Sequence, residues 1–287
     1  MTTSAAHRPF QGYEAGHYAP LLAAEDRHFW FRARNRAICA LAGQITADLA
    51  PGYRVLEVGC GNGNVLAALH RAALRGRVVG LDLYIEGLRY ARRRTDCPLV
   101  KGDVGAVPFR ARFDLIGLFD VIEHLTDDVG LLHGLHRLLE PRGRLLITVP
   151  AHRSLWSYFD EVAHHCRRYG VDELTATLES AGFEVEYCTQ YMMAIFPLVW
   201  LRRWASSFSR RASGAGRERA QREMAARELT IVPVLNGVLN FVLSQEAHFL
   251  TRRKRLPLGT SLVAIARQSR ADGDDSSGEP ASSPSPA

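Results

Sequence analysis

The 287-residue sequence has no long uninterrupted apolar run and no cysteine pattern of a cross-linked or zinc-binding domain. No window approaches the roughly 18 apolar residues that a membrane-spanning helix needs. The N-terminal stretch MTTSAAHRPFQGYEAGHY also lacks the apolar segment of a secretory signal. Cys39, Cys60, Cys97, Cys166 and Cys188 are odd in number, widely scattered and without a CxxC pair. We therefore expect a cytoplasmic protein without disulfides or structural zinc.

Lysine is scarce as well: Lys101 and Lys254 are the only two, and all other basic side chains are arginine. The net charge is +6 and the isoelectric point is near 9.3. Such a charge fits an anionic partner, either nucleic acid or a membrane surface. It fits equally a genomic preference for arginine, so the positions of the arginines carry more information than their number.

From residue 53 onward, short runs rich in Val, Ile and Leu alternate with segments of helical spacing. Apolar residues make up 47% of the chain, enough for a sizeable core. Strands alternating with helices indicate βαβ units and a mostly parallel sheet, so we expect an α/β, Rossmann-like fold. The expected strands cover residues 54–58, 77–82, 98–103, 113–120, 144–150, 184–192 and 260–267.

The rest of the chain divides around this core into parts with different composition. We expect a loose arm over 1–17, helices over 18–50 and a cofactor-binding core over 53–190. A helical insertion over 192–257 precedes the last strand, which makes 18–267 one domain. The tail, 268–287, is rich in Ser, Pro, Asp and Gly and lacks core-forming residues, so we expect it to be disordered.

A glycine-rich loop follows the first expected strand, in the stretch VLEVGCGNGN that begins at Val55. Gly59, Gly61 and Gly63 alternate with other residues and open the next helix. Such a loop lets the backbone approach a nucleotide-like ligand. The spacing is GxGxG, and Asn64 stands where the dinucleotide fingerprint GxGxxG has its third glycine. The loop alone therefore does not identify the ligand.

Carboxylates at consecutive strand ends indicate the kind of ligand more clearly than the glycine spacing of the loop does. Ligands of open α/β sheets bind at the carboxyl ends of the strands. Such an acidic rim repels a pyrophosphate and suits S-adenosylmethionine, which carries a sulfonium, an ammonium and a ribose diol. The alternative is that these acids only cap the following helices. The rim consists of Glu57, Asp82, Asp103 and Asp120, with Glu123 just beyond.

As a set, the motifs of this sequence resemble those of the class I S-adenosylmethionine-dependent methyltransferases. The resemblance covers about residues 53–190 and rests on VLEVGCGNG, VVGLD, KGDVGAVPF, FDLIGLFDVIEHL and LEPRGRLLITVP in this order. It implies a seven-stranded sheet with an antiparallel last strand. It also implies that the methionine part of the cofactor binds at Glu57 and the glycines, and the ribose at Asp82. The cofactor-binding residues it implies are Glu57, Gly59, Gly61, Gly63, Asp82, Leu83, Asp103, Val104, Phe119 and Asp120.

The sequence further resembles a bacterial subgroup of these enzymes that act on small molecules or lipids. The resemblance rests on HFWFRARNR near the N-terminus and on VPAHRSLWSYFDEVAHHCRRY after the fifth expected strand. We expect the aromatic helix with Phe29, Trp30 and Phe31 to fold over the cofactor as a lid. A helix that simply packs on the core explains the pattern equally well.

The segment DVIEH places Asp120, Glu123 and His124 on one face if a helical turn starts there. With His165 they resemble the divalent-metal site of ubiquinone-pathway O-methyltransferases and small-RNA 2′-O-methyltransferases, although Asp120 replaces a longer glutamate. Mixed carboxylate and imidazole ligands suit Mg, Mn or Zn. Alternatively, His124 or His165 acts as a metal-free general base, or these residues only shape the pocket.

The residues Arg167, Arg168 and Tyr169 follow directly after this histidine. Two uses of them fit the sequence: they grip an acidic acceptor, or they begin the next helix.

The insertion over 192–257 is apolar at both ends and contains arginine clusters. These features favour a lipid-like acceptor or contact with an anionic membrane at its inner face; helix packing or a homodimer interface explains them as well. Nucleic acid is not expected, because the arginines lack interleaved aromatics. The arginines are 202, 203, 210, 211, 217, 219, 222 and 227, followed by RRKR at 252–255.

The sequence thus predicts a methyltransferase that uses S-adenosylmethionine, acting most plausibly on oxygen of a small or lipid-like acceptor. The alternatives are an NAD(P)-dependent oxidoreductase, and a catalytically silent methyltransferase-like scaffold at a membrane surface.

Overall fold

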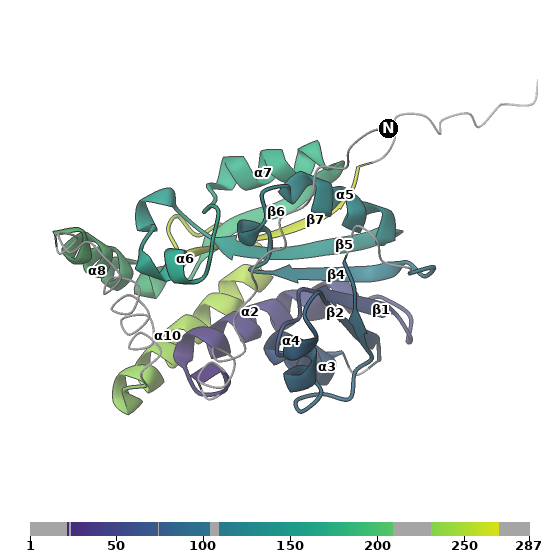
Figure 1. Ribbon diagram of the computed structural model, residues 1–287, viewed down its shortest axis with the longest axis horizontal. Helices are drawn as coiled ribbons and strands as arrows, with labels where there is room; N and C mark the ends of the chain where they lie inside the picture. The colour runs from purple at the N-terminus through teal and green to yellow at the C-terminus, as the bar shows by residue number, and fades with distance from the viewer. Residues whose placement is uncertain (1–21, 23, 74, 104–108, 209–230, 270–287) are drawn as a thin grey trace, which may run out of the picture.

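The computed structural model describes residues 22, 24–73, 75–103, 109–208 and 231–269. They form a seven-stranded sheet in the order β3-β2-β1-β4-β5-β7-β6 (Figure 1). Neighbouring strands are parallel except at β7, which is antiparallel to both β5 and β6. The expected fold class is therefore confirmed. The strands are β1 (Arg54–Val58), β2 (Arg77–Asp82), β3 (Leu99–Lys101), β4 (Phe113–Phe119), β5 (Leu139–Pro150), β6 (Phe183–Tyr191) and β7 (Ser261–Gln268).

Helices cover both faces of the sheet, because its central strands are apolar on both sides. Alternate residues of β1 point to opposite cores: Val55 packs with α2, α3 and α10, and Leu56 packs with α5 and α7. The helices are α2 (Phe29–Thr46), α3 (Asn64–Ala72), α4 (Ile85–Ala91), α5 (Asp128–Leu138), α6 (Tyr158–Val162), α7 (Val171–Ser180), α8 (Phe196–Phe208) and α10 (Pro233–Thr251). Single 3-10 turns are η2 (Ile122–His124), η3 (Arg153–Leu155) and η4 (Met193–Ile195).

The two ends of the chain lie mostly outside the described residues. The expected arm over 1–17 is among the parts that are not described, and so is the tail from 270 onward. The last strand extends one residue beyond the expected boundary, since Gln268 pairs with Phe183. No helix within the described ranges is long and apolar enough to cross a membrane.

The insertion between β6 and β7 contributes α8 and α10, and its middle, 209–230, lies outside the described residues. The helix α10 packs along α2. A buried carboxylate joins α10 to the end of β6: Glu246 accepts hydrogen bonds from the backbone N–H groups of Met192 (2.6 Å) and Ala194 (3.1 Å). The insertion is thus anchored on the sheet through charge-assisted hydrogen bonds.

Replacing Glu246 with Ala leaves these two backbone donors without their acceptor. We expect the free energy of unfolding to fall by about 2–3 kcal/mol, because an unsatisfied buried donor costs roughly 1–3 kcal/mol. Urea unfolding followed by circular dichroism measures this change. The exposed neighbour Gln245 provides the control, and Gln245→Ala should change stability by no more than about 0.5 kcal/mol. Equal effects of the two variants would contradict the anchoring role of Glu246.

Candidate functional site

The glycine loop joins β1 to α3 through backbone conformations that favour glycine. Gly59, Gly61 and Gly63 all have positive φ, at 71°, 50° and 79°. A side chain at Gly59 would clash as well, because an added Cβ would lie 2.6 Å from Cγ2 of Val121. At Gly63, the N-cap of α3, an added Cβ would lie 2.8 Å from Cβ of Ala91. The loop is therefore held in one tight shape at the carboxyl end of β1.

The last residue of β2, Asp82, holds this loop in place. One carboxylate oxygen accepts the Gly61 N–H (2.7 Å), and the other accepts the Tyr84 N–H (2.8 Å). Burial raises the pKa of Asp82, while these backbone hydrogen bonds act in the opposite direction. Each carboxylate oxygen has more than one acceptor site. Asp82 can therefore hold the loop and still accept hydroxyl groups of a ligand.

A second buried carboxylate, Glu57, lies on β1 just before the loop. Its Oε2 atom is buried and has no hydrogen-bond partner among the described residues. Burial raises the pKa of Glu57 to about 8; the nearby Arg34 opposes this shift and Asp82 adds to it. A carboxyl group kept neutral in this way is ready to bind a cation, which would stabilise its ionised form.

The helix α2 reaches this acidic edge with an arginine. Arg34 is buried, and its Nη1 atom lies 2.6 Å from Oδ2 of Asp120 at the end of β4. Its guanidinium also lies over the rings of Trp30 (4.9 Å) and Phe31 (5.6 Å). On the same helix, the side-chain amide of Asn35 donates to Oδ1 of Asn64 at the start of α3 (2.8 Å). The aromatic helix therefore packs on the core and brings Arg34 to this edge, and its expected role as a lid over the cofactor stays a prediction.

Arg34 was not among the site residues predicted from the sequence, although its position in the helical pattern indicates its role. Phe31, Arg34, Ile38 and Leu41 follow one another at helical spacing, and all four are buried. An arginine on the buried face of an apolar helix indicates an anionic partner, because an unpaired buried charge is costly.

The residue after β4, Asp120, has the left-handed conformation with φ 54°. Aspartate tolerates this region better than most side chains. Its two oxygens face different partners: Oδ2 accepts from Arg34, and Oδ1 accepts from the Thr148 hydroxyl (3.3 Å). Asp120 therefore neutralises the arginine of α2 at this edge.

The remaining residues expected at the cofactor differ in burial. Phe119 is buried and belongs to the core on the α2 side of the sheet. Leu83 is exposed directly after β2, and Asp103 is exposed after β3. Val104 lies outside the described residues. The expected contacts of these residues with the cofactor stay predictions.

A compact cluster of possible metal ligands follows Asp120. Ligand atoms of Glu123, His124 and His165 all lie within 4.8 Å of one another. Glu123 is fully buried, and neither of its carboxylate oxygens has a partner in the described part of the chain. Burial raises its pKa well above the usual range, and the neighbouring Asp120 adds to the shift. The expected fourth ligand, Asp120, is instead held by Arg34 and lies outside this cluster.

The two histidines of the cluster are oriented differently. Nδ1 of His165 lies 3.0 Å from Oδ1 of Asp160, which also accepts from Arg168 (2.7 Å). Burial would raise the pKa of Asp160, but hydrogen bonds from His165 and Arg168 outweigh it and lower the pKa to about 2. An ionised Asp160 requires His165 to donate from Nδ1, which leaves the Nε2 lone pair available as a base or ligand. Burial and the adjacent His165 lower the pKa of His124 to about 3, so His124 is neutral.

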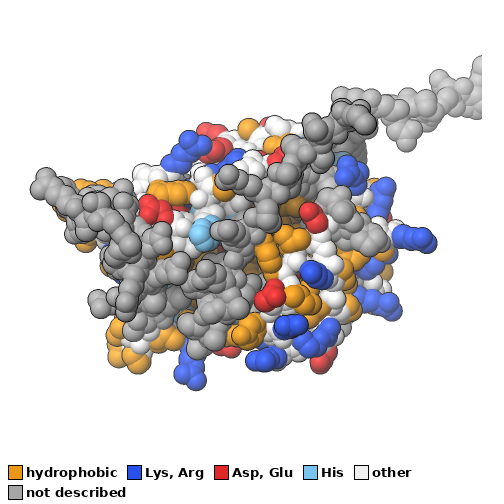
Figure 2. Space-filling view, in the orientation of Figure 1, with side chains coloured by type: hydrophobic (Ala, Val, Ile, Leu, Met, Phe, Trp, Pro, Cys, Tyr) orange, Lys and Arg blue, Asp and Glu red, His pale blue; other side chains and the backbone are white. Residues whose placement is uncertain are grey.

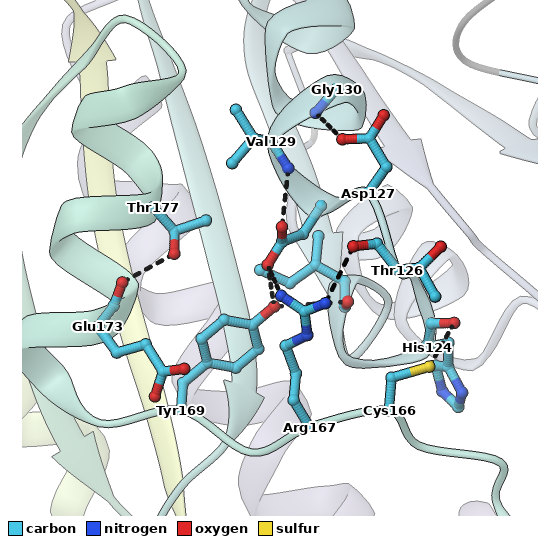
Figure 3. Close-up of polar contacts among 12 residues, drawn as sticks. His124, Thr126, Asp127, Val129, Gly130, Cys166, Arg167, Tyr169, Glu173 and Thr177 are labelled. Atoms are coloured by element: carbon cyan, nitrogen blue, oxygen red, sulfur yellow. Dashed lines mark hydrogen bonds and ion pairs between the residues drawn. The ribbon is translucent and has the colours of Figure 1, made fainter.

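Hydrogen bonds made by Arg167 and Tyr169 fix the loop that follows His165 against the loop that follows His124 (Figure 3). Arg167 (2.8 Å) and the hydroxyl of Tyr169 (2.7 Å) both donate to Oδ2 of Asp128. Nearer the cluster, the Cys166 N–H donates to the carbonyl of Glu123 (2.6 Å). The spacing of the histidines is therefore set by structure rather than by a ligand.

The paired arginines that follow His165 do not begin the next helix, and both already pair with acids of this chain. Arg167 pairs with Asp128 and Arg168 with Asp160. The next helix, α7, begins only at Val171.

Comparison with known proteins identifies the family to which this chain belongs. Residues 23–187 match the methyltransferase-domain family. The chain belongs to the class I S-adenosylmethionine-dependent methyltransferases. Within this family S-adenosylmethionine is the cofactor, which agrees with the acidic edge and opposes a nicotinamide dinucleotide.

Two curated relatives and one solved structure illustrate the range of the family. A probable S-adenosylmethionine-dependent methyltransferase of Mycolicibacterium smegmatis is 33% identical over 168 residues, covering 56% of this chain and 62% of the relative. A ubiquinone biosynthesis O-methyltransferase of Thiobacillus denitrificans is 26% identical over 125 residues, covering 41% and 48%. The chain thus spans less than two thirds of the length of these relatives.

The plantazolicin methyltransferase BamL, solved with S-adenosylhomocysteine and a substrate analogue, is similar in fold. The TM-score is 0.55 at 12% identity, covering 88% of this chain and 91% of that one. At this identity the comparison supports the methyltransferase fold alone.

The raised pKa of Glu57 predicts a pH-dependent affinity for S-adenosylmethionine. If the cofactor's cation binds the ionised form, the group must lose a proton on binding, because its pKa of about 8 keeps it protonated at neutral pH. The dissociation constant should then fall about tenfold from pH 6 to pH 7, with release of about one proton. Isothermal titration calorimetry in buffers of different ionisation enthalpy measures both.

The matched control for this prediction is Glu57→Gln, which keeps the shape of the side chain and cannot ionise. This variant should bind the cofactor weakly and with little dependence on pH between 6 and 7. An unchanged pH dependence in the variant would show that another group titrates.

Proposed function

We propose that this chain transfers the methyl group of S-adenosylmethionine to an oxygen atom of a small or lipid-like acceptor. The observation that carries the proposal is the cluster of Glu123, His124 and His165 beside the cofactor edge. A sulfonium donor is already activated, so the enzyme must align the acceptor and, for a hydroxyl, help to remove its proton. A cluster of one carboxylate and two imidazoles has the chemistry for that second task.

The cluster fits a divalent metal ion by its donor set and by the unpartnered buried oxygens of Glu123. Glu123, His124 and His165 would hold Mg, Mn or Zn. When bound, such an ion would lower the pKa of an acceptor hydroxyl. Without an ion, Nε2 of His165 is the group placed to take the proton, because Asp160 holds the other ring nitrogen. In either case Asp160 orients the imidazole, and in the metal-free case it would also stabilise the positive charge that the ring gains with the proton.

Two further observations support an oxygen acceptor of apolar character. The relative from Thiobacillus denitrificans is named for O-methylation in ubiquinone biosynthesis. In this chain, the helices that follow β6 expose large apolar side chains. We propose that the enzyme works in the cytoplasm or peripherally at the inner face of the membrane, where a lipid-like acceptor would be available.

A label-transfer experiment tests the proposed function directly. The purified protein is incubated with methyl-labelled S-adenosylmethionine and a host extract, and the label is followed into organic and aqueous phases. We expect label in the organic phase, and none with Asp82→Ala, which removes the carboxylate that holds the glycine loop. Cofactor binding without any transfer would instead favour a catalytically silent scaffold.

Replacing His165 with Asn should lower the rate of methyl transfer about a hundredfold or more, because a positioned proton acceptor contributes about that factor. The dissociation constant for S-adenosylmethionine should stay nearly unchanged. The exposed neighbour His164 has φ 56°, a conformation that asparagine tolerates, so His164→Asn is the matched control and should retain activity. Equal losses in both variants would contradict the assigned role of His165.

Chelation separates the metal-dependent role of the cluster from the metal-free one. If the cluster holds an ion, a chelator should abolish transfer, and Mg, Mn or Zn should restore it. The same ion should raise the melting temperature of the wild type and not that of Glu123→Gln. Transfer that survives chelation, together with no metal-dependent stabilisation, would assign the proton to His165 alone.

A further inference from the structure

The two helices of the insertion, α8 and α10, expose large apolar side chains to solvent. On α10 the side chains recur at helical spacing, and Val234 and Phe241 are 80% and 67% exposed. Figure 2 shows hydrophobic side chains over the lower-left end of α10. We name this surface the α8/α10 face; it comprises Trp200, Leu201 and Trp204 of α8 and Val234, Val238 and Phe241 of α10.

The opposite side of α10 is apolar as well. Leu243, Ala247 and Leu250 are buried, and Leu243 and Leu250 belong to the core that α10 shares with α2. A helix at the surface of a soluble domain normally has a polar outer side, and one that is apolar all round is covered on both sides. The α8/α10 face is therefore a surface for a partner.

The charges around this face indicate an anionic partner. Exposed cations flank the two helices: Arg202 lies on α8, and Arg252 and Lys254 follow α10. Among the described residues of 192–258, the one carboxylate is Glu246, which is buried against backbone N–H groups. A second copy of this chain would bring these like charges together, which disfavours a dimer through this face.

The combination of tryptophan, aliphatic and arginine side chains is typical of helices that lie at a membrane interface. Tryptophan rings concentrate at the headgroup level. Basic residues beside them attract anionic lipid headgroups. An in-plane helix needs apolar surface on one side only, which agrees with the packing of α10 on α2.

We propose that the α8/α10 face docks on an anionic lipid bilayer, with both helices lying in the plane of its surface. Docking would also make the membrane the source of a lipid-like acceptor. This assignment of the acceptor source rests on the proposed function. The docking itself does not depend on catalysis.

The bilayer-facing helices are joined to the cofactor edge through α2. Oδ1 of Asn236 on α10 accepts from the Phe29 N–H at the start of α2 (2.7 Å), and Gln44 near its end donates to the Thr251 carbonyl (2.6 Å). The same helix places Arg34 on Asp120. On the other side, α8 contacts η3, the turn that follows β5. Docking would therefore bring the carboxyl edge of the sheet close to the lipid surface.

Vesicle co-sedimentation of the full chain, without cofactor or acceptor, tests the docking. One set of vesicles is pure phosphatidylcholine, and the other is an equal mixture of phosphatidylcholine and phosphatidylglycerol. We expect binding to the mixed vesicles that weakens at high salt, and little binding to the neutral ones. Phe241→Ser should lower the partition coefficient about tenfold, whereas Phe241→Trp should retain binding.

A matched pair of charge variants separates a local surface from the net charge of the chain. Arg252→Ser combined with Lys254→Ser should reduce binding to the mixed vesicles about twentyfold. Arg110→Ser combined with Arg112→Ser removes the same charge just before β4, at the end of that strand opposite to Asp120. This second pair should leave binding nearly unchanged. Circular dichroism melting of each variant verifies that the fold is intact.

Two outcomes would overturn the docking proposal. One is the absence of binding to the mixed vesicles. The other is a concentration-dependent dimer in sedimentation velocity that Phe241→Ser dissociates, which would make the face an interface between copies. Calorimetric cofactor binding and label transfer are measured separately, so failure of the docking leaves the proposed function testable, and failure of methyl transfer leaves the docking testable.

Discussion

The concentration of negative charge at the carboxyl edge of the sheet is the constraint on which the site depends. Glu57, Asp82, Asp120 and Glu123 are brought to this edge by β1, β2 and β4, and burial raises the pKa of three of them. Carboxylates removed from water and close to one another cannot all ionise without compensating positive charge. At this edge Arg34 pairs with Asp120, and the positive charge of Arg168 acts to lower the pKa of Glu123 against the effect of burial. The remaining negative charge favours a cationic ligand.

The position of α2 follows from this electrostatic requirement and from packing. Its apolar face contributes Phe31, Ile38 and Leu41 to the core, and Arg34 on the same face reaches Asp120. The helix in turn supports α10 through Asn236 and Thr251. The N-terminal helix and the C-terminal insertion therefore form one layer over the sheet, although they are far apart in the sequence. A structural change at the outer surface of this layer therefore has only α2 between it and the cofactor edge.

Every strand of the sheet could be located from the sequence, because each contains a short run of β-branched and aliphatic residues between turn signals. The boundaries differ most at β3, which covers only Leu99–Lys101 of the expected 98–103, and at β5, which begins at Leu139 instead of residue 144. The runs at 54–58 and 77–82 coincide with β1 and β2. The acids at strand ends could be placed as well, since parallel strands end at one edge. The pairing of Asp120 with Arg34 could not, because that contact joins residues 86 apart in the chain. Likewise, Arg167 and Arg168 have acidic partners that only the folded loop reveals.

The same charge argument explains why three ligand candidates form the cluster instead of four. The contact with the Arg34 guanidinium directs the Asp120 carboxylate toward α2. Glu123 then lies buried beside a fixed negative charge, which raises its own pKa and favours its neutral form. A cation that arrives near Glu123 reverses this balance, because it stabilises the ionised carboxylate. The sulfonium of the cofactor and a divalent ion would both satisfy that need, and the short reach of Asp120 leaves the ligands of such an ion to Glu123, His124 and His165.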